Sequence, residues 1–170
     1  KRARILSRLH DREEALKDIQ KAWSLEPTSQ TLARRAELHL HKNHLEDASA
    51  DCLQALQLNP ANKRARFIMG SIARKQGDYQ RAIKDFSSAI QLDGTYLDAR
   101  LQRAACLEEL NQLKAALVEY DRVIELDPGR LEAFLRRGRL NFLGQDFYGA
   151  LKNYNMALKF NRGDVQITFE

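Results

Sequence analysis

Three of the four histidines lie close together in the sequence and are the first residues to test for chemistry. His39, His41 and His44 form an H-x-H-x-x-H pattern. Imidazole nitrogens bind zinc when they converge on one face with a carboxylate or a thiolate nearby. This spacing does not place all three rings on one helical face, and His41 and His44 lie on either side of an expected turn. We therefore predict no metal site and interpret these residues as histidines of a helix end and a loop.

Catalytic motifs are the next possibility, and the common ones are absent from the sequence. The chain has no P-loop, no G-x-G-x-x-G motif and no G-x-S-x-G motif. The acidic pairs Glu13-Glu14 and Glu108-Glu109 are typical of a solvated helix face rather than of a general acid and base that face each other. The sequence thus predicts a protein that is not an enzyme and needs no cofactor.

The composition is that of an ordinary globular protein. Of the 170 residues, 44% are hydrophobic and 30% are charged, which is enough to form an apolar core. No apolar run reaches the roughly 20 residues that a membrane span requires. Cys52 and Cys106 are too few for a disulfide framework and fall at core-facing helix positions. We predict a cytoplasmic location, and the net charge of +5 permits an acidic partner.

A repeat of about 34 residues defines the elements that position these side chains. Residues 69–92 contain two short amphipathic helices joined by a turn at Gln76-Gly77-Asp78. The alanine that opens the second helix recurs at intervals of 33 or 34 residues, as Ala15, Ala48, Ala82, Ala116 and Ala150. One such helix pair cannot bury its own apolar face, so it needs neighbours stacked on both sides. The sequence predicts an all-α fold, a right-handed superhelical solenoid of antiparallel helix pairs.

The repeat pattern also predicts the boundaries of the units in one continuous solenoid. A partial repeat covers residues 1–28, complete repeats cover 29–62, 63–96, 97–130 and 131–164, and a further repeat starts at 165–170. Because the chain begins without Met and partway into a repeat, we expect it to be a segment of a longer protein.

Two columns of the repeat carry predictions about packing. Small residues are expected to let the two helices of a pair approach closely, at Ala36, Gly70, Ala104 and Gly138. Arginines stand where an apolar residue would be usual, at Arg35, Arg103 and Arg137. We expect their stems to cover apolar surface while their guanidinium groups reach water.

These columns resemble the tetratricopeptide repeat family, whose unit carries an A-x3-F pair in the second helix and a late proline. Here the pair is Ala82 and Phe86, and the closing prolines are Pro27, Pro60 and Pro128. The early Trp of the family is replaced by other residues, namely Leu32, Arg66, Arg100 and Phe134. The resemblance implies a scaffold for protein–protein interaction whose first helices line a concave groove that holds an extended peptide or a helix of a partner.

Carried over residue by residue, the resemblance implies partner-binding residues on two first helices. They combine cations with aromatic rings and one hydroxyl: Arg64, Phe67, Ser71, Arg74, Lys75, Arg136, Arg139 and Phe142. The apolar column of the groove is expected at Ala33, Phe67, Leu101, Leu135 and Phe169, and packing between first helices is an equal explanation for Leu101 and Leu135. Phe142 and Leu143 are expected to form an exposed patch, which either a partner or a later repeat would cover.

The charge of the repeats alternates along the chain. It is +4 over residues 63–96, −2 over 97–130 and +3 over 131–164. This predicts a groove that is acidic around Asp98, Glu108 and Glu109 and basic on either side. Such alternation fits a partner with complementary charges, including acidic residues, and a solvated surface with scattered charges is the simpler interpretation.

Two further partner classes can be tested against the sequence. Family members that hold the C-terminal carboxylate of chaperones use a Lys and an Asn on one first helix, an Asn on the next and a Lys–Arg pair on the third. The corresponding places hold Ala33, Glu37, Ile68, Asp98 and Gln102 or, one repeat later, Phe67, Ser71, Gln102, Glu132 and Arg136. We therefore expect no chaperone tail. A structural spacer in a multiprotein assembly stays an alternative, and RNA binding is a weaker one because the acidic repeat interrupts a positive track.

Overall fold

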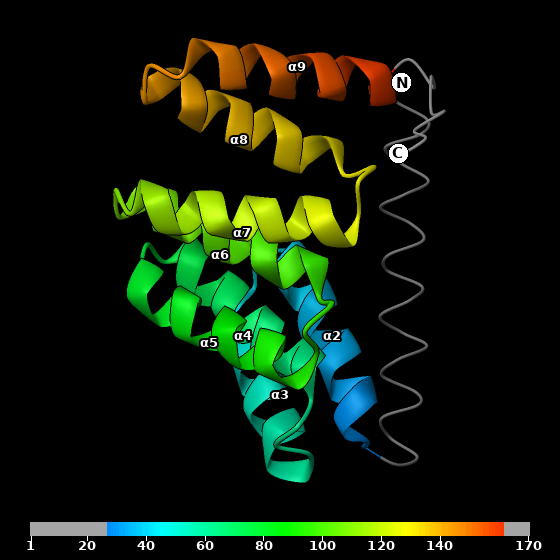
Figure 1. Cartoon of the computed structure of the whole chain (residues 1–170). Helices are drawn as coiled ribbons and strands as arrows, with labels where there is room; N and C mark the ends of the chain where they lie inside the picture. The colour runs from blue at the N-terminus through cyan, green and yellow to red at the C-terminus, as the bar shows by residue number, and fades with distance from the viewer. Residues whose placement is uncertain (1–26, 162–170) are drawn as a thin grey trace, which may run out of the picture. The chain divides into compact units, whose positions relative to one another are not determined.

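The computed structural model describes residues 27–161, which are helical apart from short turns (Figure 1). The helices are α2 (Ser29–His41), α3 (Leu45–Leu58), α4 (Lys63–Lys75), α5 (Tyr79–Leu92), α6 (Leu97–Glu109), α7 (Leu113–Leu126), α8 (Leu131–Leu143) and α9 (Phe147–Asn161). The described residues contain no strand, so the predicted all-α class is confirmed. None of these helices is both long enough and apolar enough to cross a membrane. The predictions for Glu13-Glu14, Ala15, Phe169 and the last repeat lie outside the described residues.

The helices form two compact units, one ending at Gly94 and the other beginning at Thr95. In the N-terminal unit α2 packs on α3 and α4 packs on α5, and α4 also contacts both helices of the preceding pair. In the C-terminal unit α6 packs on α7 and α8 packs on α9, and α7 contacts α8. Successive helices therefore pair as the repeat predicts.

Small residues on the first helix of a pair meet large ones on the second. A Cβ added to Gly70 would lie 2.8 Å from the ring of Phe86, and one added to Gly138 would lie 2.9 Å from the ring of Tyr154. Because real Cβ atoms do not approach so closely, each glycine is required by the close approach of its partner helix. Alanine occupies this column elsewhere, and Ala36 and Ala104 are fully buried. The predicted role of the small column is confirmed at Gly70 and Gly138.

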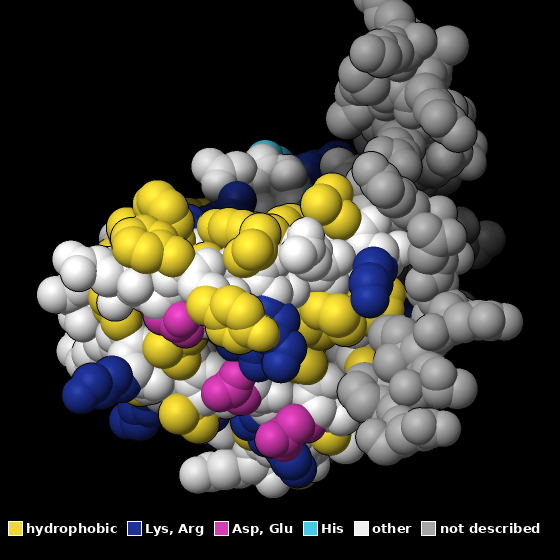
Figure 2. Space-filling view, turned by 45° about the horizontal axis from the view of Figure 1, so that its top comes forward, with side chains coloured by type: hydrophobic (Ala, Val, Ile, Leu, Met, Phe, Trp, Pro, Cys, Tyr) yellow, Lys and Arg dark blue, Asp and Glu magenta, His cyan; other side chains and the backbone are white. Residues whose placement is uncertain are grey.

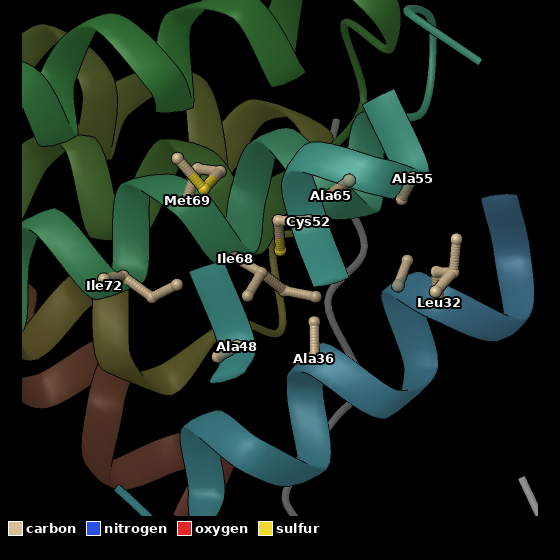
Figure 3. Packing of buried hydrophobic residues seen from close by; sticks show 10 residues of the cluster. Leu32, Ala36, Ala48, Cys52, Ala55, Ala65, Ile68, Met69 and Ile72 are labelled. Atoms are coloured by element: carbon tan, nitrogen blue, oxygen red, sulfur yellow. The ribbon is translucent and has the colours of Figure 1, made fainter. Parts of the chain in front are cut away.

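The core of the N-terminal unit is built from the facing sides of α2, α3 and α4. Figure 3 shows Leu32 and Ala36 from α2 and Cys52 from α3 together with Ile68 and Ile72 from α4. Burial raises the pKa of the Cys52 thiol to about 12, and the nearby carboxylates of Asp51 and Asp85 add to that shift. Cys52 therefore stays a neutral thiol that packs as a small apolar side chain, as its position in the sequence indicates.

The turn inside each helix pair contains one residue with left-handed backbone. These residues recur every 34 positions, as Asn43, Gly77, Asn111 and Gln145, with φ values of 63°, 79°, 57° and 65°. Glycine accepts this conformation without steric cost, and asparagine adopts it more readily than other residues with a side chain. The turn thus repeats in geometry although its residue type changes.

The arginine column makes specific contacts in addition to the predicted ones. Arg35 binds Asp51 through Nε at 2.7 Å, Arg103 binds Glu119, and Arg137 binds Asn153 Oδ1 through Nε at 2.9 Å. Each partner lies 16 residues further on, in the second helix of the same pair. These side chains stay partly exposed, and the sequence did not predict that each guanidinium group also binds a polar side chain on its partner helix. The side chains of Asp51 and Glu119 are buried by this contact.

Candidate partner-binding surface

Arg64, in the first turn of α4, lies in an exposed ion pair. Its Nε and Nη2 donate to Glu37 Oε2 of α2, at 3.1 Å and 2.5 Å. Both side chains are partly exposed, so the pair contributes little to stability. A partner carboxylate at this place would compete with Glu37 for the same guanidinium group.

Phe67, one turn further along α4, combines a fixed ring with partial exposure. It packs against the buried core of the N-terminal unit, and its ring centroid lies 5.6 Å from that of Phe86 with the two planes tilted by 49°. Ser71 donates its hydroxyl to the Phe67 carbonyl at 3.0 Å, a bond within its own helix. Phe67 is therefore a preorganised aromatic surface, whereas the Ser71 hydroxyl is already satisfied.

The last turn of α4 carries two exposed cations. Lys75 donates to Asn43 Oδ1 at 3.0 Å. The Arg74 side chain has no hydrogen bond or ion pair with any residue that the structure describes. Positive charge at a helix C-terminus is favourable because it opposes the partial negative charge of the free carbonyl groups. This turn is therefore a stable place for cations that are not neutralised by a carboxylate.

On α8, Arg139 is bound to an inward-facing glutamate. Arg139 donates to one carboxylate oxygen of Glu108, and the Tyr120 hydroxyl donates to the other. The hydrogen bond to Glu108 raises the pKa of Arg139, and burial followed by that same carboxylate raises the pKa of Tyr120. The Glu108 side chain is only 5% exposed. The prediction that Glu108 is a solvated acidic residue of the groove is therefore wrong.

Two other predicted groove charges of the C-terminal unit are engaged in surface ion pairs. Arg136 Nη2 lies 4.0 Å from Oε1 of Glu132, which is one helical turn away. Asp98 accepts a hydrogen bond from Arg130. Glu109 is exposed. The acidic character predicted for this repeat is thus reduced to few free carboxylates, because neighbouring arginines neutralise Asp98 and Glu108.

An apolar patch lies where α8 ends and α9 begins. Phe142 is 56% exposed, and its ring meets that of Phe147 edge to face with the centroids 5.5 Å apart. Leu143 and Tyr148, which directly follow these two residues in the sequence, are also exposed. Figure 2 shows hydrophobic side chains gathered on the face that it presents, with Lys and Arg side chains among them. The predicted exposure of Phe142 and Leu143 is confirmed.

The apolar column contains both residues that pack in the core and a residue that is exposed. Ala33 and Leu101 are buried and belong to the core, whereas Leu135 is exposed. Packing between helices therefore explains Leu101, and Leu135 stays available on α8 next to Tyr154, Ala157 and Leu158 of α9.

The histidine cluster contains a residue that sequence reasoning missed. His39 and His44 come together, with ring centroids 6.0 Å apart, while His41 is exposed. Asp47 lies next to both rings. The spacing H-x4-H-x2-D across a tight turn between two helices could have indicated this cluster, because the turn brings the end of one helix beside the start of the next.

Comparisons with known proteins agree with this geometry. Sequence profiles described as tetratricopeptide repeat match residues 33–96 and 73–140. No curated protein sequence matches the chain. Among solved structures, MamA is similar with a TM-score of 0.80 at 20% identity, covering 95% of each chain.

Two solved structures of peptide-binding proteins are also similar. YrrB, described as a tetratricopeptide repeat protein with an unusual peptide-binding site, gives a TM-score of 0.69 at 24% identity and covers 93% of this chain and 82% of its own. The first tetratricopeptide repeat domain of Spaghetti (RPAP3), bound to the HSP90 peptide SRMEEVD, gives a TM-score of 0.65 at 21% identity. The match covers 68% of this chain and 91% of the RPAP3 chain. These likenesses establish the fold, and the sequence profiles, which together match residues 33–140, show that the chain belongs to the tetratricopeptide repeat family.

Proposed function

We propose that this protein is a non-enzymatic scaffold that binds an extended or helical segment of another protein, one that carries acidic residues. The observation that supports this most is the side of α4 formed by Arg64, Phe67, Arg74 and Lys75. It offers an aromatic ring held in place by Phe86 and flanked by exposed cations. Rigid aromatic anchors and arginines are the residue types that contribute most to binding at protein interfaces.

A protein partner fits this surface better than a nucleic acid does. Binding along a phosphate backbone requires a continuous positive track. Arg64 is paired with Glu37, and on α8 Arg139 is paired with Glu108, so these cations are already partly neutralised. A short acidic segment needs only the local charge of Arg74 and Lys75 beside an apolar anchor.

The expected ligand differs from the chaperone peptide held by RPAP3. The places where related domains grip a C-terminal carboxylate are occupied here by Phe67, Ser71 and Glu132, among others, and Ser71 bonds to its own helix. We therefore propose an internal acidic segment with an apolar side chain that packs on Phe67. On α8, the exposed ring of Phe142 is proposed as a second anchor of the same kind.

A display library of random peptides, selected against the immobilised chain, tests this function. The wild-type chain is expected to enrich acidic peptides with a shared apolar position, and Arg74→Glu is expected to weaken their binding at least tenfold because it replaces the unpaired cation with a like charge. Lys84→Glu on α5 makes the same charge change on a second helix and is expected to leave binding unchanged. Arg139 is a poor choice here, since its removal would leave Glu108 buried without its cation.

The outcome of this selection is decisive in both directions. Enrichment of peptides whose binding depends on Arg74 and not on Lys84 supports the proposal. If no peptide family is enriched, or if Lys84→Glu and Arg74→Glu weaken binding equally, recognition by this side of α4 is disproved. Dependence on Lys84 and Lys152 alone would instead support docking by the second helices of the pairs.

A further inference from the structure

The corner between α2 and α3 brings two histidines and an aspartate together. His39 lies in the last turn of α2, His44 directly precedes α3, and Asp47 lies in its first turn. Asp47 Oδ2 is 3.8 Å from Nδ1 of His39 and 3.8 Å from Nδ1 of His44. One ligand atom from each of the three side chains lies within 4.8 Å of the other two. The three side chains thus converge on a single point.

The ring of His39 has an unsatisfied nitrogen on the side of this point. Its Nδ1 atom is buried and has no hydrogen-bond partner among the described residues. Leaving a buried polar atom without a partner is unfavourable, so such atoms are rare in folded proteins. The 3.8 Å to Asp47 is too long for a hydrogen bond. A cation between the three residues would satisfy this nitrogen.

The other nitrogen of His39 faces a buried carboxylate beyond hydrogen-bond distance. Nε2 lies 3.9 Å from Asp51 Oδ2, and Asp51 is held in place by Arg35. A carboxylate on the far side of the ring favours the tautomer with its proton on Nε2, which leaves the lone pair on Nδ1. Asp51 lies on the Nε2 side of the ring, and Nδ1 faces Asp47 on the other side.

We propose that His39, His44 and Asp47 bind a zinc ion. Two imidazoles and one carboxylate are a ligand set that suits zinc and is unsuited to calcium or magnesium, which prefer oxygen ligands alone. With bonds of about 2.0–2.1 Å, the ligand atoms of a tetrahedral zinc site lie roughly 3.4 Å apart, so separations of 3.8 Å close by small side-chain rotations.

The exposure of the site agrees with a three-ligand metal centre. The side chains of His44 and Asp47 are 55% and 64% exposed, so both are free to adjust and the fourth position is open to water. Because the ligands come from both helices of one pair, zinc would link α2 to α3 and stabilise that pair. This inference does not depend on the proposed binding of an acidic segment, which uses other residues.

Zinc titration of the metal-free full chain, in competition with a chromogenic zinc chelator, tests the site. The wild-type chain is expected to bind one zinc ion with high occupancy and to show a higher thermal unfolding midpoint with zinc than without it. His44→Ala and Asp47→Asn are each expected to lower the affinity at least tenfold. Both residues are exposed, and His44 makes no side-chain capping bond, so the variants should fold.

Two matched variants serve as controls. His41→Ala removes an exposed histidine outside the cluster, and Glu46→Gln removes an exposed acid next to Asp47; both are expected to bind zinc like the wild type. Cobalt(II) provides a second readout, since bound tetrahedral cobalt absorbs visible light and the signal should be lost in His44→Ala. If wild type and His44→Ala bind zinc equally, or if His41→Ala loses as much affinity as His44→Ala, the proposal is overturned.

Discussion

At the scale of single residues, the helix pairs differ in whether an arginine on the first helix compensates the buried polar side chain of the second. An arginine on the first helix faces Asp51, Glu119 and Asn153, but in the α4–α5 pair the arginine position holds Met69 and the partner position holds Asp85. The nearest cation to that carboxylate is Arg66, whose Nη1 lies 4.0 Å from Asp85 Oδ1. Burial raises the pKa of Asp85, and Arg81 and Arg66 offset this only in part. Asp85 is therefore a destabilising charge at neutral pH.

Asp85→Asn is expected to stabilise the protein at pH 7. A carboxyl group whose pKa is higher in the folded state than in the unfolded state lowers stability as the pH rises through those two values. The midpoint of thermal unfolding of Asp85→Asn should thus exceed that of the wild type at pH 7, and the difference should shrink as the pH falls toward the ordinary pKa of aspartate, about 3.9. Asn153 already occupies this column in the α8–α9 pair, so asparagine fits the position.

The matching change at Asp51 provides the contrast. Asp51 accepts two hydrogen bonds from Arg35, so Asp51→Asn removes one of two charged acceptor oxygens and should destabilise by about 1–3 kcal/mol. Opposite signs for Asp51→Asn and Asp85→Asn in chemical denaturation at pH 7 are expected. If both variants changed the free energy of unfolding in the same direction, the presence of Arg35 beside Asp51 would not explain the difference between the two sites.

At the scale of helices, close approach within a pair depends on the small column of the first helix. Gly70→Ala places a Cβ 2.8 Å from the Phe86 ring, which is fully buried and cannot move outward. We expect a loss of about 1–3 kcal/mol in the free energy of unfolding from this overpacking, although alanine has the better helix propensity. Gly94→Ala is the control, because nothing lies within 4 Å of its added Cβ. Urea unfolding of both variants measures the difference, and equal stability would contradict the packing argument.

The helix pairs and their small columns could be predicted from the sequence because the same residue types recur at the same position of several repeats. Gly70 and Gly138 recur at a fixed interval, and the chain's own periodicity identifies them. The partners of the arginine column could not be predicted, because a contact over 16 residues depends on how the two helices face each other. The same holds for the burial of Glu108 under Arg139, whereas the H-x4-H-x2-D spacing across a tight turn could have indicated the meeting of His39 with Asp47. The periodicity of one helix carries no information on which side chains of the next helix it will face.

At the scale of the whole molecule, stability should be distributed along the chain. Within each unit, the helices contact neighbours that are at most two elements away, and α9 packs on α8. Repeat proteins with such local contacts have stabilities that approximate a sum over units and their interfaces, so a defect in one place weakens its surroundings first.

Hydrogen exchange measured by mass spectrometry on Gly70→Val tests this distribution. The larger side chain should force α4 and α5 apart, because it meets the Phe86 ring at the closest point of the pair. We expect amide protection in α4 and α5 to fall strongly, that in α2 and α3 to fall less, and that in α8 and α9 to stay as in the wild type. A uniform loss across all these helices would show instead that the chain unfolds as a single cooperative unit, since a local defect would then lower the protection of every helix by the same free energy.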